Sequence, residues 1–275
     1  MSLAAAYAHC GEAARAWDRD RWLGALYAPE ALRGHLHALI AFEGEMSRLR
    51  EAVRDPRAGE IRLAWWREAL AGERPDEAQG NPVAAALLDT LERFRPSPHW
   101  IENAIVGRQA DFYDDGFPAM GDLEAYLGET RSGLLQIAAT VLGQSAAEAS
   151  GLAGVALGLT ELLRGLAGPR AFAFAPADGL ERRGVTPRDF RERRGSPEMT
   201  AAVVDLVAQA RRRLGEAEAA RQKLPRALSP AYAGLATAPL WLAAIERNAA
   251  RAFQTPPEVA AWRRQWALWR WMRRT

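Results

Sequence analysis

The chain has little cysteine and no long uncharged run, and each shortage excludes a class of protein. Cys10 is the only cysteine among the 275 residues, so no intramolecular disulfide can form and nothing favours a secreted fold. The longest uncharged stretch, residues 227–245, has 19 residues, is just short of the ~20 that span a bilayer, and contains Pro239. Residues 1–14 lack the basic start and clean apolar core of a signal peptide. These shortages predict a cytoplasmic protein.

Lysine and histidine are also scarce. Lys223 is the only lysine, so arginine supplies nearly all the positive charge, yet the net charge is only +2. That balance is too small for a committed nucleic-acid binder, and no arginine stripe with a known motif appears. The four histidines are scattered without ligand spacing, and no metal role is assigned to them.

What is present favours an all-α protein. Apolar residues make up 49% of the chain and charged residues 25%, which is ordinary globular composition with enough apolar residues for a sizeable core. Leu and Ala dominate, β-branched residues are sparse, and no strand-like alternation competes with the helical spacing. No repeat or low-complexity linker divides the chain, so we predict one domain over residues 1–275.

Pairs of a capping residue and a proline mark expected helix starts. The cap oxygen satisfies free backbone N–H groups, and proline loses no hydrogen bond at the first helical position. The six pairs are Asn81-Pro82, Ser97-Pro98, Thr186-Pro187, Ser196-Pro197, Ser229-Pro230 and Thr255-Pro256. The helices expected from capping and apolar spacing are 3–27 (with a break near residue 18), 30–54, 59–72, 82–95, 98–114, 122–142, 145–166, 187–194, 197–223, 230–250 and 256–272.

Residues 165–184 form the main irregular stretch. The segment follows an expected helix and contains two Gly/Pro-containing turns. Loops in such places often frame the mouth of a pocket, and a plain connector is the equal alternative.

The expected helix 30–54 carries a possible cation site. Glu43, Ser47 and Glu51 are spaced four apart and share one side of the helix, and hard divalent cations prefer several carboxylate oxygens. Chemistry alone favours the alternative, a solvated face on which these acids pair with Arg48, Arg50 and Arg54. Asp111, Asp114 and Asp115 form a second acidic group, for which a solvated turn at a helix end is also favoured over a metal site.

The C-terminal segment alternates tryptophan with arginine. Trp262, Trp266 and Trp269 share one face of the expected last helix, and the tail from residue 262 onward contains no acid. Aromatic residues interleaved with cations suit a membrane interface. Packing of the tryptophans on the bundle is the favoured alternative, and both hold if only the final turn projects.

Several segments in order resemble the squalene/phytoene synthases. The matching segments are DRWLGAL at 20–26, HALIAF at 37–42, RLAWWR at 62–67, the region of Asp111, DLEAY at 122–126, LTELLR at 159–164 and FAP at 174–176. The resemblance covers most of the chain and implies an isoprenoid-synthase helical bundle with a central apolar cavity. It also implies head-to-head joining of two prenyl diphosphates, with magnesium held by two aspartate-rich motifs on facing helices.

Both of those motifs are degenerate here. The first, Asp-Asp-x-x-Asp, falls on Ser47, Arg48 and, at its last position, Glu51; the second, Gln-x-x-Asn-x-x-Arg-Asp, has its four defined positions at Gly158, Glu161, Arg164 and Gly165. Replacement of carboxylates by an arginine removes the negative charge that holds magnesium, so no metal is expected. If a metal does bind, Glu43 and Glu51 are the candidate ligands.

The replacements leave cationic side chains that suit an anion. Arg48 and Arg164 can contact a phosphate directly, and Glu43 and Glu161 complete the possible ligand set. A simple Glu161–Arg164 ion pair is the favoured alternative.

The segment ETRSGLL at 129–135, with Thr130 and Ser132 ahead of two leucines, resembles one diverged branch of the family, the assembly factor for respiratory complex I. That resemblance implies a catalytically inactive protein that needs no cofactor, has complex I subunits or intermediates as partners and binds a prenyl or lipid ligand in the old tunnel. The alternatives are an active synthase that uses Mg²⁺ to join two farnesyl or geranylgeranyl diphosphates, and a lipid-binding module unrelated to complex I.

Overall fold

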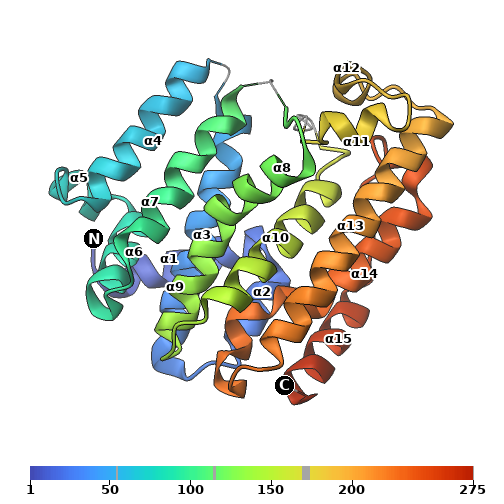
Figure 1. Ribbon diagram of the computed structural model, residues 1–275. Helices are drawn as coiled ribbons and strands as arrows, with labels where there is room; N and C mark the ends of the chain where they lie inside the picture. Colours follow the sequence, from blue (N-terminus) through green and yellow to red (C-terminus); the bar gives the residue numbers. More distant parts are fainter. Residues whose placement is uncertain (54, 114–115, 169–173, 275) are drawn as a thin grey trace.

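The computed structural model describes residues 1–53, 55–113, 116–168 and 174–274, and within them it contains helices and no strand (Figure 1). The all-α fold predicted from the sequence is therefore confirmed. The amino-terminal half contains α1 (Leu3–Trp17), α2 (Arg19–Ala25), α3 (Glu30–Ala52), α4 (Pro56–Leu70), α5 (Pro75–Gly80), α6 (Pro82–Phe94), α7 (Pro98–Val106), η1 (Gly107–Phe112), α8 (Met120–Leu127), η2 (Gly128–Ser132) and α9 (Gly133–Val141).

The carboxy-terminal half is also helical within the described residues. One large cluster of buried apolar residues runs from Ala6 in the first helix to Phe253 near the end of the chain, and a second, small cluster contains residues of the last helix. The second half contains α10 (Ala147–Arg164), α11 (Ala177–Glu181), α12 (Pro187–Arg191), α13 (Pro197–Arg221), η3 (Arg226–Tyr232), α14 (Gly234–Arg247), η4 (Ala249–Arg251) and α15 (Ala261–Arg274).

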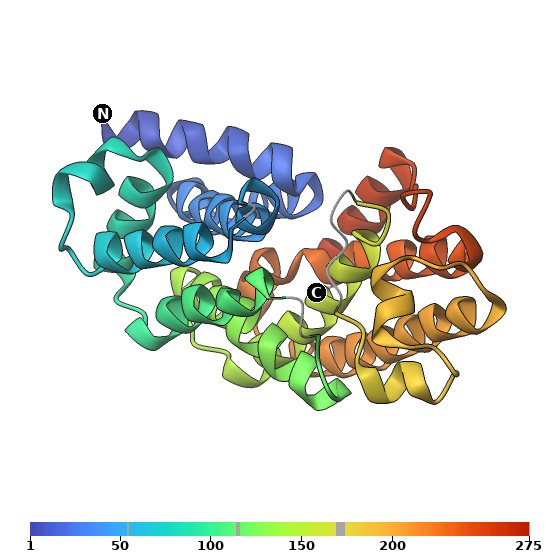
Figure 2. The same cartoon turned by 90° about the horizontal axis from the view of Figure 1, so that it is seen from above.

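The helices gather in two groups that meet at the middle of the molecule. Viewed from above, the first helices (blue to cyan) form one side and the last helices (yellow to red) form the other, with the green helices along their junction (Figure 2). Helix α10 packs against α9, α13 and α14, and α3 packs against α1, α6 and α9. Helices α3 and α10 therefore line the place where the two groups meet.

The break expected near Asp18 is confirmed, and capping explains it. The Asp18 carboxylate accepts hydrogen bonds from the backbone N–H groups of Asp20 and Arg21, at 3.1 and 3.0 Å. Its own backbone is extended, so α1 ends there and α2 begins at a new angle. This turn points Asp18 toward the junction of the two groups.

Four of the six proline pairs begin helices as predicted, and two predictions are wrong. Ser229 lies inside the 3₁₀ segment η3, where its hydroxyl donates to the carbonyl of Arg226 at 2.6 Å and so does not cap a new helix. Residues 256–260 are not helical, and α15 begins at Ala261. Pro257 accounts for this, because a proline forces the preceding residue out of the helical region.

Other boundaries also differ from the prediction. Asp55 caps α4, which begins three residues before the expected position, and the short helices α5 and α11 lie in segments expected to be loops. The expected helix 98–114 gives way to a 3₁₀ turn at Gly107, and 122–142 is interrupted by the π-helical turn η2.

Within the described residues no single helix is long and apolar enough to cross a membrane. Taken together, η3 and α14 are long and apolar enough to do so, but the two segments are bent by 42° relative to each other.

Candidate functional site

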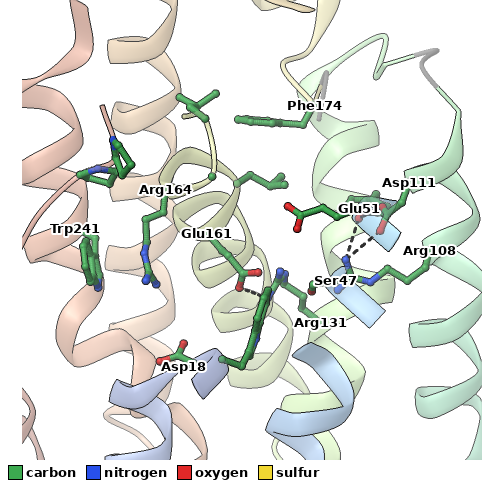
Figure 3. Close-up of a pocket in the computed structure, with 17 residues that line it drawn as sticks. Asp18, Ser47, Glu51, Arg108, Asp111, Arg131, Glu161, Arg164, Phe174 and Trp241 are labelled. Carbon is green, nitrogen blue, oxygen red and sulfur yellow. Dashed lines mark hydrogen bonds and ion pairs between the residues drawn. The ribbon is translucent and has the colours of Figure 1, made fainter. Parts of the chain in front are cut away.

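A cavity of about 390 Å³ opens where the two groups of helices meet (Figure 3). Its lining comes from segments far apart in the chain, and it combines charged side chains with large apolar ones. The lining residues are Trp17, Asp18, Ser47, Glu51, Arg108, Asp111, Tyr126, Arg131, Glu161, Leu162, Arg164, Gly165, Leu166, Phe174, Trp241, Pro256 and Pro257. Phe174, Gly165 and Leu166 belong to the segment expected to frame a pocket, of which residues 169–173 lie outside the described part.

A largely buried chain of alternating charges reaches one wall of the cavity, where Arg131 and Glu161 line it. Arg131 donates to Glu43, and it also contacts Glu161 at 2.7 Å. The other Glu43 oxygen accepts from Arg21 at 2.5 Å. Arg21, Glu43, Arg131 and Glu161 therefore alternate in sign and join four elements: α2, α3, η2 and α10 (Figure 3 shows the Arg131–Glu161 end).

Burial and pairing act in opposite directions on Glu43. Burial raises the pKa of its carboxyl, but the positive charges of Arg21 and Arg131 outweigh burial, so the pKa lies below its ordinary value. Glu43 is therefore ionised and engaged at both oxygens. The solvated acidic face that chemistry alone favoured for this helix is wrong at Glu43, whose exposed fraction is 2%. The side chain of Arg50 and all of Arg54 lie outside the described part.

Local backbone geometry places Arg131 in that wall. It lies in η2, the π-helical turn between α8 and α9, and such turns are frequent at functional sites. Space for its side chain comes from Gly158 on α10. A Cβ atom at Gly158 would stand 2.9 Å from Arg131 Cδ and 2.6 Å from Leu127 Cδ2. The glycine at the first position of the degenerate second motif therefore leaves room for the arginine.

A second polar cluster lies beside this wall, close enough for Arg131 and Glu43 to act on Arg108 electrostatically. Tyr126 donates its hydroxyl hydrogen to Asp111, and Arg108 Nη1 lies 3.3 Å from the other Asp111 oxygen. All three side chains are buried. Burial and the neighbouring Asp111 charge raise the pKa of Tyr126. The solvated turn favoured for the acidic group 111–115 is therefore wrong at Asp111, and Asp114 and Asp115 lie outside the described part.

Arg164 is the cavity cation that does not join an ion pair among the described residues. Its guanidinium lies 4.1 Å from the ring centroid of Trp241, beside the cavity (Figure 3). Arg164 is thus held by a cation–π contact on α14. The expected Glu161–Arg164 ion pair is not formed, because Glu161 pairs with Arg131.

The residues of the degenerate first motif diverge in position. Ser47 and Glu51 line the cavity, one helical turn apart. Arg48 lies outside its lining, where its Nε donates to the carbonyl of Gly44 at 3.0 Å and its guanidinium stacks over Trp17. Of the two arginines expected to reach a phosphate, only Arg164 faces the cavity.

Five buried hydrogen-bond donors of the cavity wall have no partner within the described residues. They belong to residues on four elements that line the cavity, and the hydrogen of each has no acceptor in the described protein. These donors are Ser47 Oγ, Arg108 Nε, Arg108 Nη2, Arg131 Nε and Trp241 Nε1. Only three other buried side-chain polar atoms of the described chain lack a partner, so such groups concentrate at this cavity.

The donor set does not suit a cluster of magnesium ions. Of the four acids that line the cavity, Glu161 and Asp111 are paired with arginines and Asp18 caps α2. Only Glu51 is left without a protein partner among the described residues. Within the described residues, no group of three His, Cys, Asp or Glu side chains is placed to hold a metal. Magnesium is bound through carboxylate oxygens, of which this wall leaves few unpaired, and the wall presents arginine N–H groups in their place.

A family model for squalene/phytoene synthase matches residues 14–270, which is nearly the whole chain. This protein belongs to the squalene/phytoene synthase family. The family suspected from the sequence is thus confirmed, and so is its isoprenoid-synthase fold.

Curated relatives include NADH dehydrogenase (ubiquinone) complex I assembly factor 6. The rat protein is 27% identical over 244 residues, which cover 87% of this chain and 73% of the relative. The human protein is 26% identical over 229 residues, which cover 82% of this chain and 69% of the relative. The branch suspected from Thr130 and Ser132 is therefore represented among its relatives.

Solved structures of family members share the fold. The squalene synthase HpnC from Alicyclobacillus acidocaldarius superposes with a TM-score of 0.71 at 21% identity, covering 90% of this chain and 95% of that one. A dehydrosqualene synthase in complex with ligand gives a TM-score of 0.82 at 17% identity, covering 99% and 96% of the two chains. At these identities the likeness shows the fold alone.

Sequence reasoning found part of this site and missed its cations. Glu43, Glu51, Glu161 and Arg164 were expected near one another, and all lie at the cavity or in the charge chain beside it. Arg21, Arg108 and Arg131 were not singled out as site residues. The sequence signal for Arg131 was its place in the segment 129–135, which was used only as evidence of resemblance.

Proposed function

We propose that this protein assists assembly of respiratory complex I and does not join prenyl diphosphates. The observation that carries the proposal is that Arg131 forms ion pairs with Glu43 and Glu161, so these carboxylates are engaged by an arginine. Relatives that cover more than four fifths of this chain are named as complex I assembly factors. The partners are complex I subunits or assembly intermediates, met in the cytoplasm or at the inner face of the cytoplasmic membrane.

Two measurements test this function together. Deleting the gene should lower NADH:quinone oxidoreductase activity and leave carotenoids and hopanoids unchanged. Purified protein given magnesium, a hydride donor (NADPH) and labelled farnesyl or geranylgeranyl diphosphate should form no squalene, dehydrosqualene or phytoene. Clear turnover would favour the alternative, an active head-to-head prenyltransferase, and unchanged complex I activity in the deletion strain would overturn the assembly role.

We further propose that the cavity holds a prenyl or lipid ligand through an oxygen-rich head group, without a metal or other cofactor. The five unpartnered donors and Arg164 supply the polar contacts, and Leu162, Phe174 and Trp241 supply apolar ones. Hydrogen bonds to charged groups contribute about 1.5–3 kcal/mol each. A phosphate or carboxylate head group would therefore be held directly by arginine and tryptophan N–H groups.

The probe for this ligand site is farnesyl phosphate, with binding measured by calorimetry in EDTA and in magnesium. Arg164→Gln should weaken binding by roughly tenfold or more, the equivalent of one such hydrogen bond. Arg48→Gln is the matched control, because it removes the same charge from outside the cavity lining and should leave affinity unchanged. Binding that requires magnesium, or equal losses in both variants, would overturn the direct contact.

A further inference from the structure

The last helix exposes an unusual amount of aromatic surface. Trp262, Trp266 and Trp269 on α15 are 68%, 54% and 39% exposed. Their spacing of four and three residues places them in one row along the helix. The rings of Trp266 and Trp269 stack with centroids 4.8 Å apart, and the Arg273 guanidinium lies 4.8 Å from the Trp269 ring. We call Trp262, Trp266 and Trp269 the tryptophan row.

Contacts of the opposite face of α15 with the bundle fix the orientation of the helix, so that the tryptophan row faces outward. Leu268 and Met272 are buried against the bundle, with exposed fractions of 3% and 4%. Arg264 forms an ion pair with Asp20 at 2.6 Å, and the Trp271 ring N–H donates to Glu218 at 2.8 Å. The helix packs against α14 and α2 at the edge of the bundle (Figure 1). Packing of the tail on the bundle, the favoured expectation, therefore holds for this face and is wrong for the tryptophan row.

The charge around the row has one sign. Residues 261–274 contain five arginines and no acid. With Arg264 paired to Asp20, four exposed arginines remain free to meet an anionic surface. Helical geometry places Arg273 in line with the tryptophan row and Arg263, Arg270 and Arg274 along one flank.

We propose that α15 docks this protein flat on an anionic membrane surface, with the tryptophan row at the level of the lipid head groups. Amphipathic helices with arginines beside tryptophans bind that interface, since the rings enter the boundary and the long cationic side chains reach the phosphates. The excess of arginine without any acid on α15 complements the negative charge of phospholipid head groups. A bilayer provides the flat negative plane that this row requires. The inference does not depend on a role in complex I assembly.

Co-sedimentation of the full chain with vesicles tests the proposal. The protein should sediment with vesicles of phosphatidylcholine and phosphatidylglycerol, and weakly or not at all with phosphatidylcholine alone. The triple variant W262A/W266A/W269A should lose at least about tenfold in affinity, since burying even one large aromatic side chain is worth that much. Arg→Gln changes at 263, 270 and 273 should each lower affinity roughly fivefold.

Matched variants separate this surface from general effects. Ile61 on α4 is 70% exposed, so Ile61→Ala removes an exposed apolar side chain elsewhere and should leave vesicle binding unchanged. Thermal unfolding of each variant verifies that it is folded. The proposal is overturned if the wild-type chain ignores anionic vesicles, or if the triple variant binds them as well as the wild type. Light scattering that shows a dimer dissociated by the triple variant, with no loss of vesicle binding, would assign the row to a second copy of the chain. These vesicle and light-scattering results do not bear on the proposed role in complex I assembly, which the gene deletion tests separately.

Discussion

Arginine is used in opposite ways at the cavity and on α15. At the cavity, Arg21, Arg108 and Arg131 are largely buried, and each contacts a carboxylate from another part of the fold or the next helical turn. On α15, the arginines other than Arg264 are exposed beside tryptophans and lack acids on their own helix. The buried set fixes how helices meet, whereas the exposed set leaves its charge available to something outside the molecule.

This contrast makes the two regions differ in what a substitution costs. Breaking a buried ion pair leaves an uncompensated charge in a low-dielectric site, which is strongly destabilising. Changing an exposed side chain usually alters stability by about 0.5 kcal/mol or less. The predictions below test that difference, starting where the expected effect is largest.

Glu43→Gln should lower the free energy of unfolding by about 3–5 kcal/mol, because Arg21 loses its ion-pair partner and Arg131 keeps only Glu161. Chemical denaturation with circular dichroism measures this. Glu51→Gln is the control on the same helix, exposed at the cavity, and should change stability by about 0.5 kcal/mol or less. Equal losses in the two variants would show that the buried charge chain has no special role.

Gly158→Ala should cost about 1–3 kcal/mol, because the new methyl group would overlap Leu127 and the stem of Arg131. Gly151→Ala on the same helix meets no atom within 4 Å and should stabilise the protein by up to about 1 kcal/mol through helix propensity. The comparison uses the same denaturation assay. A harmless Gly158→Ala would mean that Arg131 can move aside.

Acid should remove the contribution of Glu43. Its folded pKa lies below the ordinary 4.5, so the stabilisation is complete above pH 4.5 and is lost as pH falls toward the folded pKa. The difference in unfolding free energy between wild type and Glu43→Gln should therefore be constant from pH 7 to about pH 5 and then shrink. Denaturation curves at several pH values measure it. A gap that stays constant at lower pH would contradict the depressed pKa.

Trp266→Ala on α15 should change the free energy of unfolding by about 0.5 kcal/mol or less, since its side chain is half exposed. Trp241→Ala at the cavity is the matched tryptophan, 8% exposed, and should cost about 3–5 kcal/mol. Thermal and chemical unfolding distinguish the two. A large loss at Trp266 would mean that the tryptophan row supports the bundle and is not reserved for an outside surface.

Local rules predicted most helices and failed where a neighbour decided the outcome. Asn81 and Ser196 cap the helices that their prolines begin, because capping involves only nearby backbone. At Thr255 the second proline, Pro257, prevents the helix start that the pair alone predicted. The π-helical turn at 128–132 has no comparable local signal in the sequence.

The candidate site divides along the same line. Helical spacing showed that Glu43, Ser47 and Glu51 share a side of α3, and the degenerate motifs showed which acids are missing. Helical spacing could not show that Glu43 is buried, since its burial depends on packing of α2 and η2, which are distant in the sequence, against α3.

The sequence by itself determined the helical class, the family and the loss of the aspartates that hold magnesium, because residue type and short spacing carry that information. Tertiary structure decided what replaced them. Only the approach of η2 to α3 and α10 sets Arg131 between Glu43 and Glu161, and only the packing of Leu268 and Met272 turns the tryptophan row outward. Ion pairing and burial depend on distances between segments that are far apart in the chain, and these distances exist only in the folded molecule.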